Sequence, residues 1–355
     1  MMTPVKRVNR FFLLATAPFF GLLLCLMLVQ PALELDLKTE LYSPADGPLA
    51  ETAKLKGELQ TAGHTAAETA RTIGDSVKLY NRTTAVMNGI VVQAKAQAGR
   101  PASIYNRRIQ TRLGWPLKIV DSQRINLELY RINPGSYNGY ALKVKLKDPS
   151  AMAMSLGTGS PGSSETTLQA VLRSGAVAGI NAGGFADRSG KRYPLGTTMI
   201  GGQYVDGFQP SSKNLTFVGL NKKGRLIGGA FSSRSQLDRL QPSFGATFVP
   251  VLLRGGVPLP IPEKWRTSPT RAPRTVIGNY KDDQLLVLVV NGYNESGNSG
   301  ATLAELQNKL RALGVVDAYN LDGGGSSSLI LNGTVLNRPS DGRLRQVPTH
   351  FLFFK

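Results

Sequence analysis

The chain contains little of the side-chain chemistry on which many enzymes depend. Its 355 residues include one cysteine, Cys25, and two histidines, His64 and His350. The cysteine lies in an apolar N-terminal run, so the rest of the chain has no thiol, no disulfide and no cysteine-based metal site. With so few histidines, the sequence also disfavours a zinc site and a Ser-His-Asp triad.

Acidic residues are also scarce relative to basic ones. The chain has 42 Lys and Arg against 23 Asp and Glu, which gives a formal net charge of +19. Such a surface attracts polyanions, although a basic proteome without a specific acidic partner would show the same balance. The sequence has no zinc-finger spacing and no RNA-stacking aromatic motif, so we expect no nucleic-acid partner. An anionic or phosphorylated glycan is the partner that we predict.

The N-terminal segment has the pattern of an uncleaved membrane anchor. Basic residues at positions 6, 7 and 10 precede an uncharged apolar run from Phe11 to Val29, close to the ~20 residues that a spanning helix needs. A cleavable signal peptide is the alternative, but the run is followed by a poor cleavage site. We therefore predict a cytoplasmic tip and transmembrane anchor over residues 1–35. The charge distribution places the main domain outside the cytoplasm, in the periplasm or at the cell surface.

Residues 36–115 are predicted to form a mostly helical stalk or linker. From about Leu49 to Ala98, small and apolar residues recur at alternating spacings of four and three, which is a heptad pattern interrupted by glycines. A helical stalk that self-associates and a loosely ordered linker are the two interpretations of this segment. None of its residues suggests catalytic chemistry.

Residues 116–355 read as one domain of strands and packed helices. Apolar and polar residues alternate over Ile125 to Leu129 and Leu142 to Leu146, which predicts two half-buried strands around a turn. The segment Thr166 to Ser174 predicts a short helix, capped at its C-terminus by Gly175.

A second helix lies between two buried strands near the C-terminus. Leu285 to Val290 is a continuous apolar run, and Thr302 with Glu305 makes a capping box for a helix that stops at Gly314. With the next strand, this predicts a right-handed β-α-β unit with parallel strands. The predicted fold class is therefore α+β: a mixed β-sheet core with packed helices and a C-terminal β-α-β unit, preceded by a transmembrane helix and a helical stalk.

The last of these strands runs into a loop of three glycines and three serines that starts at Asp322. Consecutive glycine amides can form a concave nest for an anion, although a plain surface turn would use the same residues. An earlier passage has a similar pattern: a helix, a glycine and a strand that ends at Asn181, followed by further glycines. We expect Asn181 and Asn320 to occupy equivalent strand ends on one cleft, unless the two passages are alike by chance.

A P-loop is excluded because no lysine follows the glycines. A serine hydrolase is excluded because there is no Gly-x-Ser-x-Gly elbow.

Three passages together resemble the phosphodiester glycosidase family. They are Ile180 to Phe185, Pro273 to Gly278 and Asn320 to Ser327, and the similarity continues through Val335 to Asp341 and Arg345. The family includes the domain of the mannose-6-phosphate uncovering enzyme and bacterial exopolysaccharide-related envelope proteins. The resemblance covers roughly Asp121 to Lys355.

This resemblance implies hydrolysis of a sugar-1-phosphodiester at the anomeric carbon, in an envelope or exopolysaccharide glycan. A non-catalytic glycan-binding or polysaccharide-assembly protein using the same cleft is the alternative. The positions that match the family's functional residues are Asn181, Asp187, Arg274, Asn320, Asp322, Gly323, Gly324, Gly325 and Ser326. The chain departs from the family at Asn291-Gly292-Tyr293, where an acidic and a basic residue are often found.

The chemistry of the reaction suggests a role for each residue type. A carboxylate near the anomeric carbon could stabilise an oxocarbenium ion or activate water, and we assign this to Asp322 with Asp187 as its partner. Arg274 offers a planar fork for phosphate oxygens, and the glycine amides and the Ser326 hydroxyl would hold the others. Asn181 and Asn320 would bind sugar hydroxyls. Turn capping for the carboxylates and asparagines and a structural ion pair for Arg274 remain the alternatives. The reaction requires no cofactor, though two carboxylates beside a phosphate could recruit a divalent cation.

Overall fold

The computed structural model describes residues 4–28, 47–293 and 299–355. Internal contacts divide the chain into two units, Met1–Val91 and Val92–Lys355. The predicted domain boundary between residues 35 and 36 lies outside the described residues.

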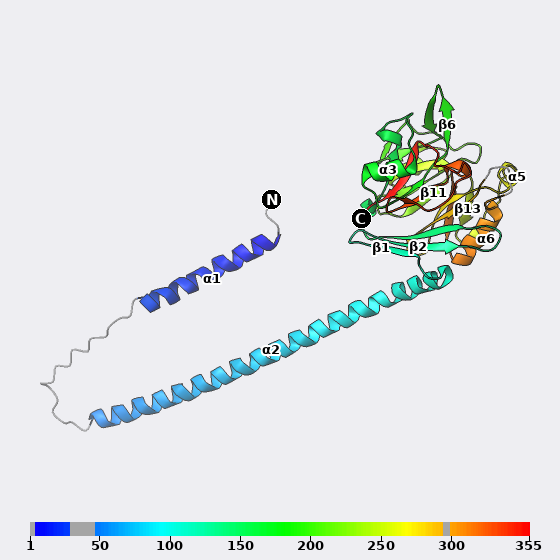
Figure 1. Ribbon diagram of the computed structural model, residues 1–355. Helices are drawn as coiled ribbons and strands as arrows, with labels where there is room; N and C mark the ends of the chain where they lie inside the picture. The colour runs from blue at the N-terminus through cyan, green and yellow to red at the C-terminus, as the bar shows by residue number, and fades with distance from the viewer. Residues whose placement is uncertain (1–3, 29–46, 294–298) are drawn as a thin grey trace. The chain divides into compact units, whose positions relative to one another are not determined.

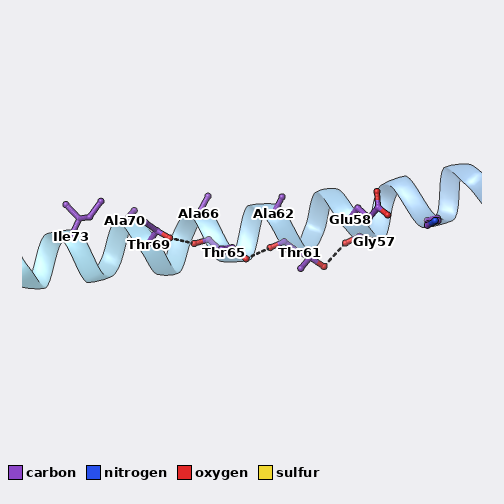
Figure 2. Close-up of a pocket in the computed structure, with 10 residues that line it drawn as sticks. Gly57, Glu58, Thr61, Ala62, Thr65, Ala66, Thr69, Ala70 and Ile73 are labelled. Carbon is purple, nitrogen blue, oxygen red and sulfur yellow. Dashed lines mark hydrogen bonds between the residues drawn. The ribbon is translucent and has the colours of Figure 1, made fainter. Parts of the chain in front are cut away.

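The described part of the first unit is helical. Helix α1 spans Pro4–Leu28, and helix α2, Gly47–Leu113, continues into the second unit. The helix predicted from Leu49 to Ala98 lies within α2, and all its side chains from residue 51 to residue 98 are exposed. Figure 2 shows four side chains that project from one side of α2: Ala62, Ala66, Ala70 and Ile73.

The predicted transmembrane helix is contradicted by the structure. A helix does form over the apolar run, but α1 also takes in Lys6, Arg7 and Arg10 and has Pro18 in its interior. Within residues 4–28, 47–293 and 299–355, no helix combines the length and the apolar character needed to cross a membrane.

The second unit is built on an eight-stranded sheet. In spatial order its strands are β1 (Lys118–Asp121), β2 (Ile125–Ile132), β3 (Gly139–Leu146), β16 (Leu285–Val290), β15 (Thr275–Asn279), β17 (Asp317–Leu321), β13 (Val251–Arg254) and β14 (Val257–Pro258). The hairpin of β2 and β3 confirms the two alternating strands predicted from the sequence.

Two five-stranded sheets and a hairpin complete the β-structure. One sheet has the order β19 (Thr334–Val335), β18 (Leu329–Leu331), β5 (Ala178–Asn181), β20 (Thr349–Phe353) and β4 (Met152–Leu156). The other has the order β11 (Leu226–Gly229), β10 (Thr216–Asn221), β12 (Pro242–Phe248), β8 (Met199–Ile200) and β9 (Gln203–Tyr204). The hairpin consists of β6 (Phe185–Arg188) and β7 (Lys191–Pro194).

Short helices connect and cover these sheets. They are α3 (Thr167–Ser174), α4 (Arg234–Asp238), α5 (Glu263–Thr267) and α6 (Leu303–Leu313), with 3-10 turns at Pro149–Ala151, Gly157–Gly159 and Gly324–Ser326. Helix α6 packs on the eight-stranded sheet, whereas α3 packs on the sheet that contains β5 (Figure 1). The predicted caps are present: Thr302 forms a capping box with Glu305, and Gly175 and Gly314 end the two helices in the left-handed conformation. Thr166, expected as the first residue of its helix, is the N-cap of α3 and forms a second capping box.

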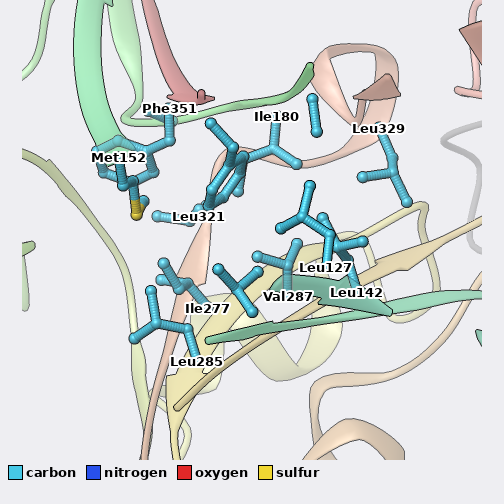
Figure 3. Close-up of a cluster of buried hydrophobic side chains, with 14 of the residues drawn as sticks. Leu127, Leu142, Met152, Ile180, Ile277, Leu285, Val287, Leu321, Leu329 and Phe351 are labelled. Atoms are coloured by element: carbon cyan, nitrogen blue, oxygen red, sulfur yellow. The ribbon is translucent and has the colours of Figure 1, made fainter. Parts of the chain in front are cut away.

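The main hydrophobic core lies between the eight-stranded sheet and the sheet that contains β5. Figure 3 shows side chains from the two sheets meeting in this layer. The eight-stranded sheet contributes Leu127, Leu142, Ile277, Leu285, Val287 and Leu321, and the other sheet contributes Met152, Ile180, Leu329 and Phe351. The opposite face of the eight-stranded sheet is covered by α6 and by the last turns of α2, including Ile109 and Leu113.

The mixed sheet with a parallel β-α-β unit is also contradicted. Every strand pair among the described residues is antiparallel, and β15 lies between β16 and β17 and pairs with both. Strands β16 and β17 therefore run in the same direction without being neighbours. The apolar run of β16 arises from burial on both faces, because Leu285 and Val287 enter one core and Leu286 and Leu288 the other. A central antiparallel strand and a parallel strand give the same apolar pattern.

A buried ion pair joins β2 to β3 in the eight-stranded sheet, and the end of α2 is hydrogen-bonded to it. Lys143 Nζ lies 2.9 Å from Glu128 Oε1, and the two side chains are 2% and 7% exposed. Gln110 Nε2 donates to both Glu128 oxygens at 3.1–3.2 Å, and Tyr130 donates its hydroxyl to the same carboxylate. Burial acts to raise the pKa of Glu128, but these hydrogen bonds outweigh it and hold the pKa below its ordinary value. The carboxylate is therefore charged in the folded protein.

Replacing Glu128 with Gln should destabilise the second unit by about 3–5 kcal/mol, because Lys143 would stay buried without a counter-charge. Urea unfolding of the full chain measures this free energy. The double variant Glu128→Leu/Lys143→Met is the control and should recover most of the loss. A loss below about 1 kcal/mol in the single variant would contradict the assigned role.

Stability should also fall on acidification because of His350. This side chain is fully buried in β20, its Nδ1 lies 3.2 Å from Thr167 Oγ1, and burial lowers its pKa to about 4. At a pH between this value and the ordinary pKa of 6.5, His350 binds a proton in the unfolded chain but not in the folded protein. Between pH 7 and pH 4.5, this group alone should remove about 2.5 kcal/mol from the free energy of unfolding.

Denaturant unfolding at the two pH values tests this expectation. The pH-dependent loss should shrink by about 2.5 kcal/mol in His350→Gln. It should be unchanged in the control variant His64→Gln, whose histidine is exposed on α2. An unchanged loss in His350→Gln would show that other groups cause the acid sensitivity.

Candidate active site

A cavity of about 880 Å³ opens where β15 begins and β17 ends. Its lining comes from segments far apart in the sequence: Phe185, Leu195, residues 212–215, Phe248, Val249, Pro262, Lys264, Trp265, Pro269, Ala272, Arg274, Asp322, Gly323, Gly324 and Arg345. A hollow of about 1060 Å³ along α2 is larger, but one exposed helix face bounds it (Figure 2). It lacks the enclosing walls of a small-molecule site.

Asp322 is half-buried in the wall of this cavity, at the first position after β17. Its backbone is fixed on both sides: the amide donates to Ala182 O at 3.1 Å, and the carbonyl accepts from Asn181 Nδ2 at 2.6 Å. Its Oδ1 accepts from the amide of Gly323 at 3.0 Å. The carboxylate is therefore held at a defined place in the cavity wall.

Asn181 is fully buried at the end of β5 and lies behind this wall, not in its lining. Besides the bond to Asp322, its Oδ1 accepts from Thr275 Oγ1 at 2.8 Å and from the amide of Ser328 at 3.0 Å. One side chain thus connects β5, β15 and both ends of the glycine loop. The structure gives Asn181 a positioning role in place of the sugar contact expected from the sequence.

Asn320 is also buried, near the end of β17, and is absent from the cavity lining. Its Nδ2 donates to Val249 O at 2.6 Å, while its Oδ1 is buried and has no hydrogen-bond partner among the described residues. Asn181 is the last residue of β5 and Asn320 is the last but one of β17, so both lie near strand ends, but neither lines the cleft as the repeated sequence pattern suggested. The two strands belong to different sheets.

The glycine loop is more closed than a free anion nest. The amide of Gly324 donates to Pro273 O at 2.8 Å, and that of Ser326 donates to Gly323 O at 3.1 Å within a 3-10 turn. Gly323 and Gly324 line the cavity, whereas Gly325 and Ser326 are buried outside its lining. The phosphate contact expected from the Gly324 amide and the Ser326 hydroxyl is not part of this arrangement.

Arg274 precedes β15 and lines the cavity, though it is only 3% exposed. Its Nη2 donates to Pro269 O at 2.9 Å and its Nε donates to Ala301 O at 3.4 Å. These bonds fix the plane of the guanidinium against the loop between β14 and β15.

Asp187 does not join Asp322. It lies on β6 and lines a separate cavity, with Oδ1 3.1 Å from Arg192 Nε. The two carboxylates expected to act together are thus in different cavities, so they form no shared cation site. Within the described ranges, no three His, Cys, Asp or Glu side chains come together as metal ligands.

The departure from the family pattern at 291–293 has a local structural function. Asn291 bonds to the Asn138 side chain at 2.6 Å and accepts from the Arg338 amide at 2.8 Å, which ties three loops together. Tyr293 is 62% exposed. Neither residue lines the cavity around Asp322.

The cavity has features that the sequence did not reveal. Besides Arg274 and Asp322, its charged lining residues are Lys213, Lys264 and Arg345, so the lining contains one carboxylate and four cationic side chains. Aromatic residues form part of the wall: Phe185, Phe248 and Trp265, with the last two rings 5.6 Å apart. Phe185 lies in one of the passages that resemble the family, whereas Phe248 and Trp265 had no signal in the sequence.

The sequence comparisons agree with this arrangement. A sequence model described as phosphodiester glycosidase matches residues 174–354. The chain belongs to the phosphodiester glycosidase family. The matched range includes Asn181, Arg274 and Asp322, together with every other residue that lines the cavity.

Individual phosphodiester glycosidases give the same result over shorter stretches. N-acetylglucosamine-1-phosphodiester alpha-N-acetylglucosaminidase from Bos taurus is 29% identical over 202 residues, which cover 52% of this chain and 37% of that protein. The protein of the same name from Homo sapiens is 43% identical over 68 residues, or 19% of this chain and 13% of that one. The chain thus spans little more than a third of the bovine relative.

The fold is shared with a solved member of the family. The structure is the zebrafish N-acetylglucosamine-1-phosphodiester alpha-N-acetylglucosaminidase catalytic domain, auto-inhibited by its pro-peptide. It matches with a TM-score of 0.54 and 21% identity, covering 66% of this chain and 85% of that one.

Replacing Asn181 with Ala should destabilise the protein by about 3 kcal/mol or more, because it leaves three buried partners unpaired at about 1–3 kcal/mol each. The control is Asn320→Ala, which removes an equally buried asparagine that makes one side-chain hydrogen bond. We expect the control to cost about half as much by denaturant unfolding. An equal or larger loss in Asn320→Ala would show that Asn181 is not the central connection of the site.

Proposed function

We propose that this chain hydrolyses a sugar-1-phosphodiester at the anomeric carbon. The bond from C1 to the bridging phosphate oxygen breaks and water adds to C1. One proton of the water ends on the phosphomonoester that leaves. The observation that carries this proposal is one partly aromatic cavity that is lined by a single carboxylate, Asp322, and by four cationic side chains. Family membership supports the same reaction class.

The cations suit the phosphate part of such a substrate. Lys213, Lys264, Arg274 and Arg345 together favour an anionic ligand, and a guanidinium group suits phosphate oxygens because of its planar shape. Because the guanidinium groups of Arg274 and Arg345 are held in place before binding, these two cations need little reorganisation as negative charge grows on the leaving phosphate.

The aromatic wall suits the sugar. A pyranose ring has apolar C–H faces, and Phe185, Phe248 and Trp265 offer rigid apolar surfaces with polar groups close by. In the arrangement that we propose, the sugar binds against this wall with its anomeric carbon toward Asp322, and Lys264, 5.7 Å from the centroid of the Trp265 ring, adjoins the same wall.

Asp322 is the group that we assign to the reacting carbon. The transition state develops positive charge on the sugar ring, which a carboxylate at this position would stabilise while it orients or activates water. Phosphate is a good leaving group, so a second carboxylic acid is less necessary than for an ordinary glycoside. The absence of Asp187 from the cavity of Asp322 is compatible with a reaction that needs only one carboxylate.

The names of the relatives guide the choice of the first substrate. They are named for N-acetylglucosamine-1-phosphodiester, so an α-linked N-acetylglucosamine 1-phosphodiester is the compound to assay first. An envelope or exopolysaccharide glycan as the natural substrate remains a prediction that the basic net charge supports. A main domain outside the cytoplasm remains a prediction made from the charges that flank the N-terminal apolar run.

Replacing Asp322 with Asn should lower kcat by roughly 1,000-fold, equivalent to about 4 kcal/mol of transition-state stabilisation. Release of free sugar from the α-linked diester measures this. Asp317→Asn, at the other end of β17, removes a carboxylate outside the cavity and should stay within about twofold of wild type. Circular dichroism should show both variants folded.

Two results would contradict the proposal. Retained activity in Asp322→Asn would reject the role of this carboxylate. Absence of sugar release by the wild type, together with tight binding of the uncleaved diester, would identify the protein as a non-catalytic glycan binder.

A further inference from the structure

The middle of α2 carries an apolar stripe that the described residues leave exposed. Its eight members recur at alternating spacings of four and three: Ala66, Ala70, Ile73, Val77, Tyr80, Thr84, Met87 and Val91. The five large side chains among them are 48–72% exposed. Figure 2 shows the first three members projecting from one side of the helix, where they line the hollow along α2. These eight residues are named the α2 stripe.

The period of the stripe indicates the kind of surface that would cover it. An α-helix has 3.6 residues per turn, and a helix that packs on a globular core has an apolar face of that period. The alternating spacings of the α2 stripe average 3.5 residues instead. This shorter period keeps an apolar stripe in contact with a second helix when the two supercoil. A partner helix therefore fits this surface better than a sheet or a small ligand does.

The rest of this stretch of α2 offers little that would stabilise a single helix in water. Glycines interrupt it at positions 57, 63, 74 and 89, and glycine has a far lower helix propensity than alanine. Its exposed ion pairs, such as that of Lys78 with Asp75 at 3.4 Å, contribute little. Helices in proteins gain most of their stability from packing of an apolar face. A partner on the α2 stripe would supply that packing.

The residues that flank the stripe favour a second copy of this chain as the partner. In a coiled coil, the flanking residues of the two helices meet across the interface, where like charges oppose association. All flanking residues are uncharged: Ala67, Thr69, Gly74, Ser76, Asn81, Thr83, Asn88 and Ile90. The charged residues of the same stretch all lie on the outer side of the helix: Glu68, Arg71, Asp75, Lys78 and Arg82. Two copies can therefore approach each other without repulsion between like charges.

The stripe is also complementary to itself in size when two copies run antiparallel. A twofold axis midway between Val77 and Tyr80 pairs a smaller side chain with a larger one in every layer. The pairs are Ala66 with Val91, Ala70 with Met87, Thr84 with Ile73, and Val77 with Tyr80. A parallel pairing would instead set alanine against alanine and tyrosine against tyrosine, which leaves gaps in some layers and crowds others.

We propose that the α2 stripe binds a second copy of this chain, as an antiparallel two-stranded coiled coil over residues 66–91. The paired helices would be in contact over about 39 Å. No residue of the stripe lines the cavity around Asp322. The inference is therefore independent of the proposed reaction and goes beyond it.

Sedimentation equilibrium of the full chain tests for the dimer. The wild type should show a monomer–dimer equilibrium at concentrations up to about 100 μM. Val77→Lys should raise the Kd of the dimer about 100-fold, because each dimer then loses two apolar side chains from the interface and gains two charges there. Lysine has a higher helix propensity than valine, so unfolding of α2 would not explain such a loss.

Val86→Lys is the matched control. Val86 is 56% exposed, against 53% for Val77, and lies outside both the stripe and its flanks. The same substitution there should leave the Kd within about twofold of wild type. A wild type that stays monomeric over the whole concentration range, or an equal loss of association in Val86→Lys, would overturn the proposal.

Disulfide cross-linking tests the antiparallel arrangement. Cys25 is the only cysteine of the chain, so Cys25→Ser provides a background without thiols. In that background, an equimolar mixture of Ala66→Cys and Val91→Cys chains should form a disulfide between the two kinds of chain on oxidation. Neither variant alone should do so, because positions 66 and 91 lie about 37 Å apart along one helix and a disulfide needs close Cα atoms. Efficient disulfide formation within either single variant, without the mixed product, would overturn the antiparallel pairing.

Discussion

The hydrogen bond from Asn181 to the backbone of Asp322 is the interaction on which the rest of the site depends. Asn181 ends β5, Asp322 follows β17, and these strands belong to separate sheets with the main core between them. The same amide side chain also accepts from Thr275 and from Ser328, on the far side of the glycine loop. Packing of the two sheets therefore fixes the position of Asp322. A shift between the sheets would break the buried hydrogen bonds of Asn181, which water could not replace.

Charge distribution explains how this framework could select its substrate. The cavity around Asp322 is lined by one carboxylate, four cationic side chains and three aromatic rings. The substrate that we propose, a sugar with an attached phosphate, suits both the aromatic and the cationic lining. Asp341 holds Arg345 in a fixed orientation, so this cation needs little reorganisation to meet a phosphate.

The sequence predicted features whose signals are local. The helix caps at Gly175, Thr302 and Gly314 and the strand before Asp322 follow from short patterns. The prediction failed where long-range contacts decide the structure. The order of strand, helix and strand suggested a parallel pair, but β15 lies between β16 and β17 and pairs with both in the antiparallel direction. Phe185 and Phe248 come from distant strands, and the burial of Asn181 depends on the packing of two sheets, so no local pattern could reveal either.

The central claim is that water attacks the sugar carbon beside Asp322 and not the phosphorus. Hydrolysis of an α-N-acetylglucosamine 1-phosphodiester in ¹⁸O-labelled water tests this claim directly, by mass spectrometry of the released phosphomonoester. The account predicts a phosphomonoester free of ¹⁸O, because its bridging oxygen departs with the phosphate. Incorporation of ¹⁸O into the phosphomonoester would show cleavage at phosphorus and would contradict the assignment of this cavity.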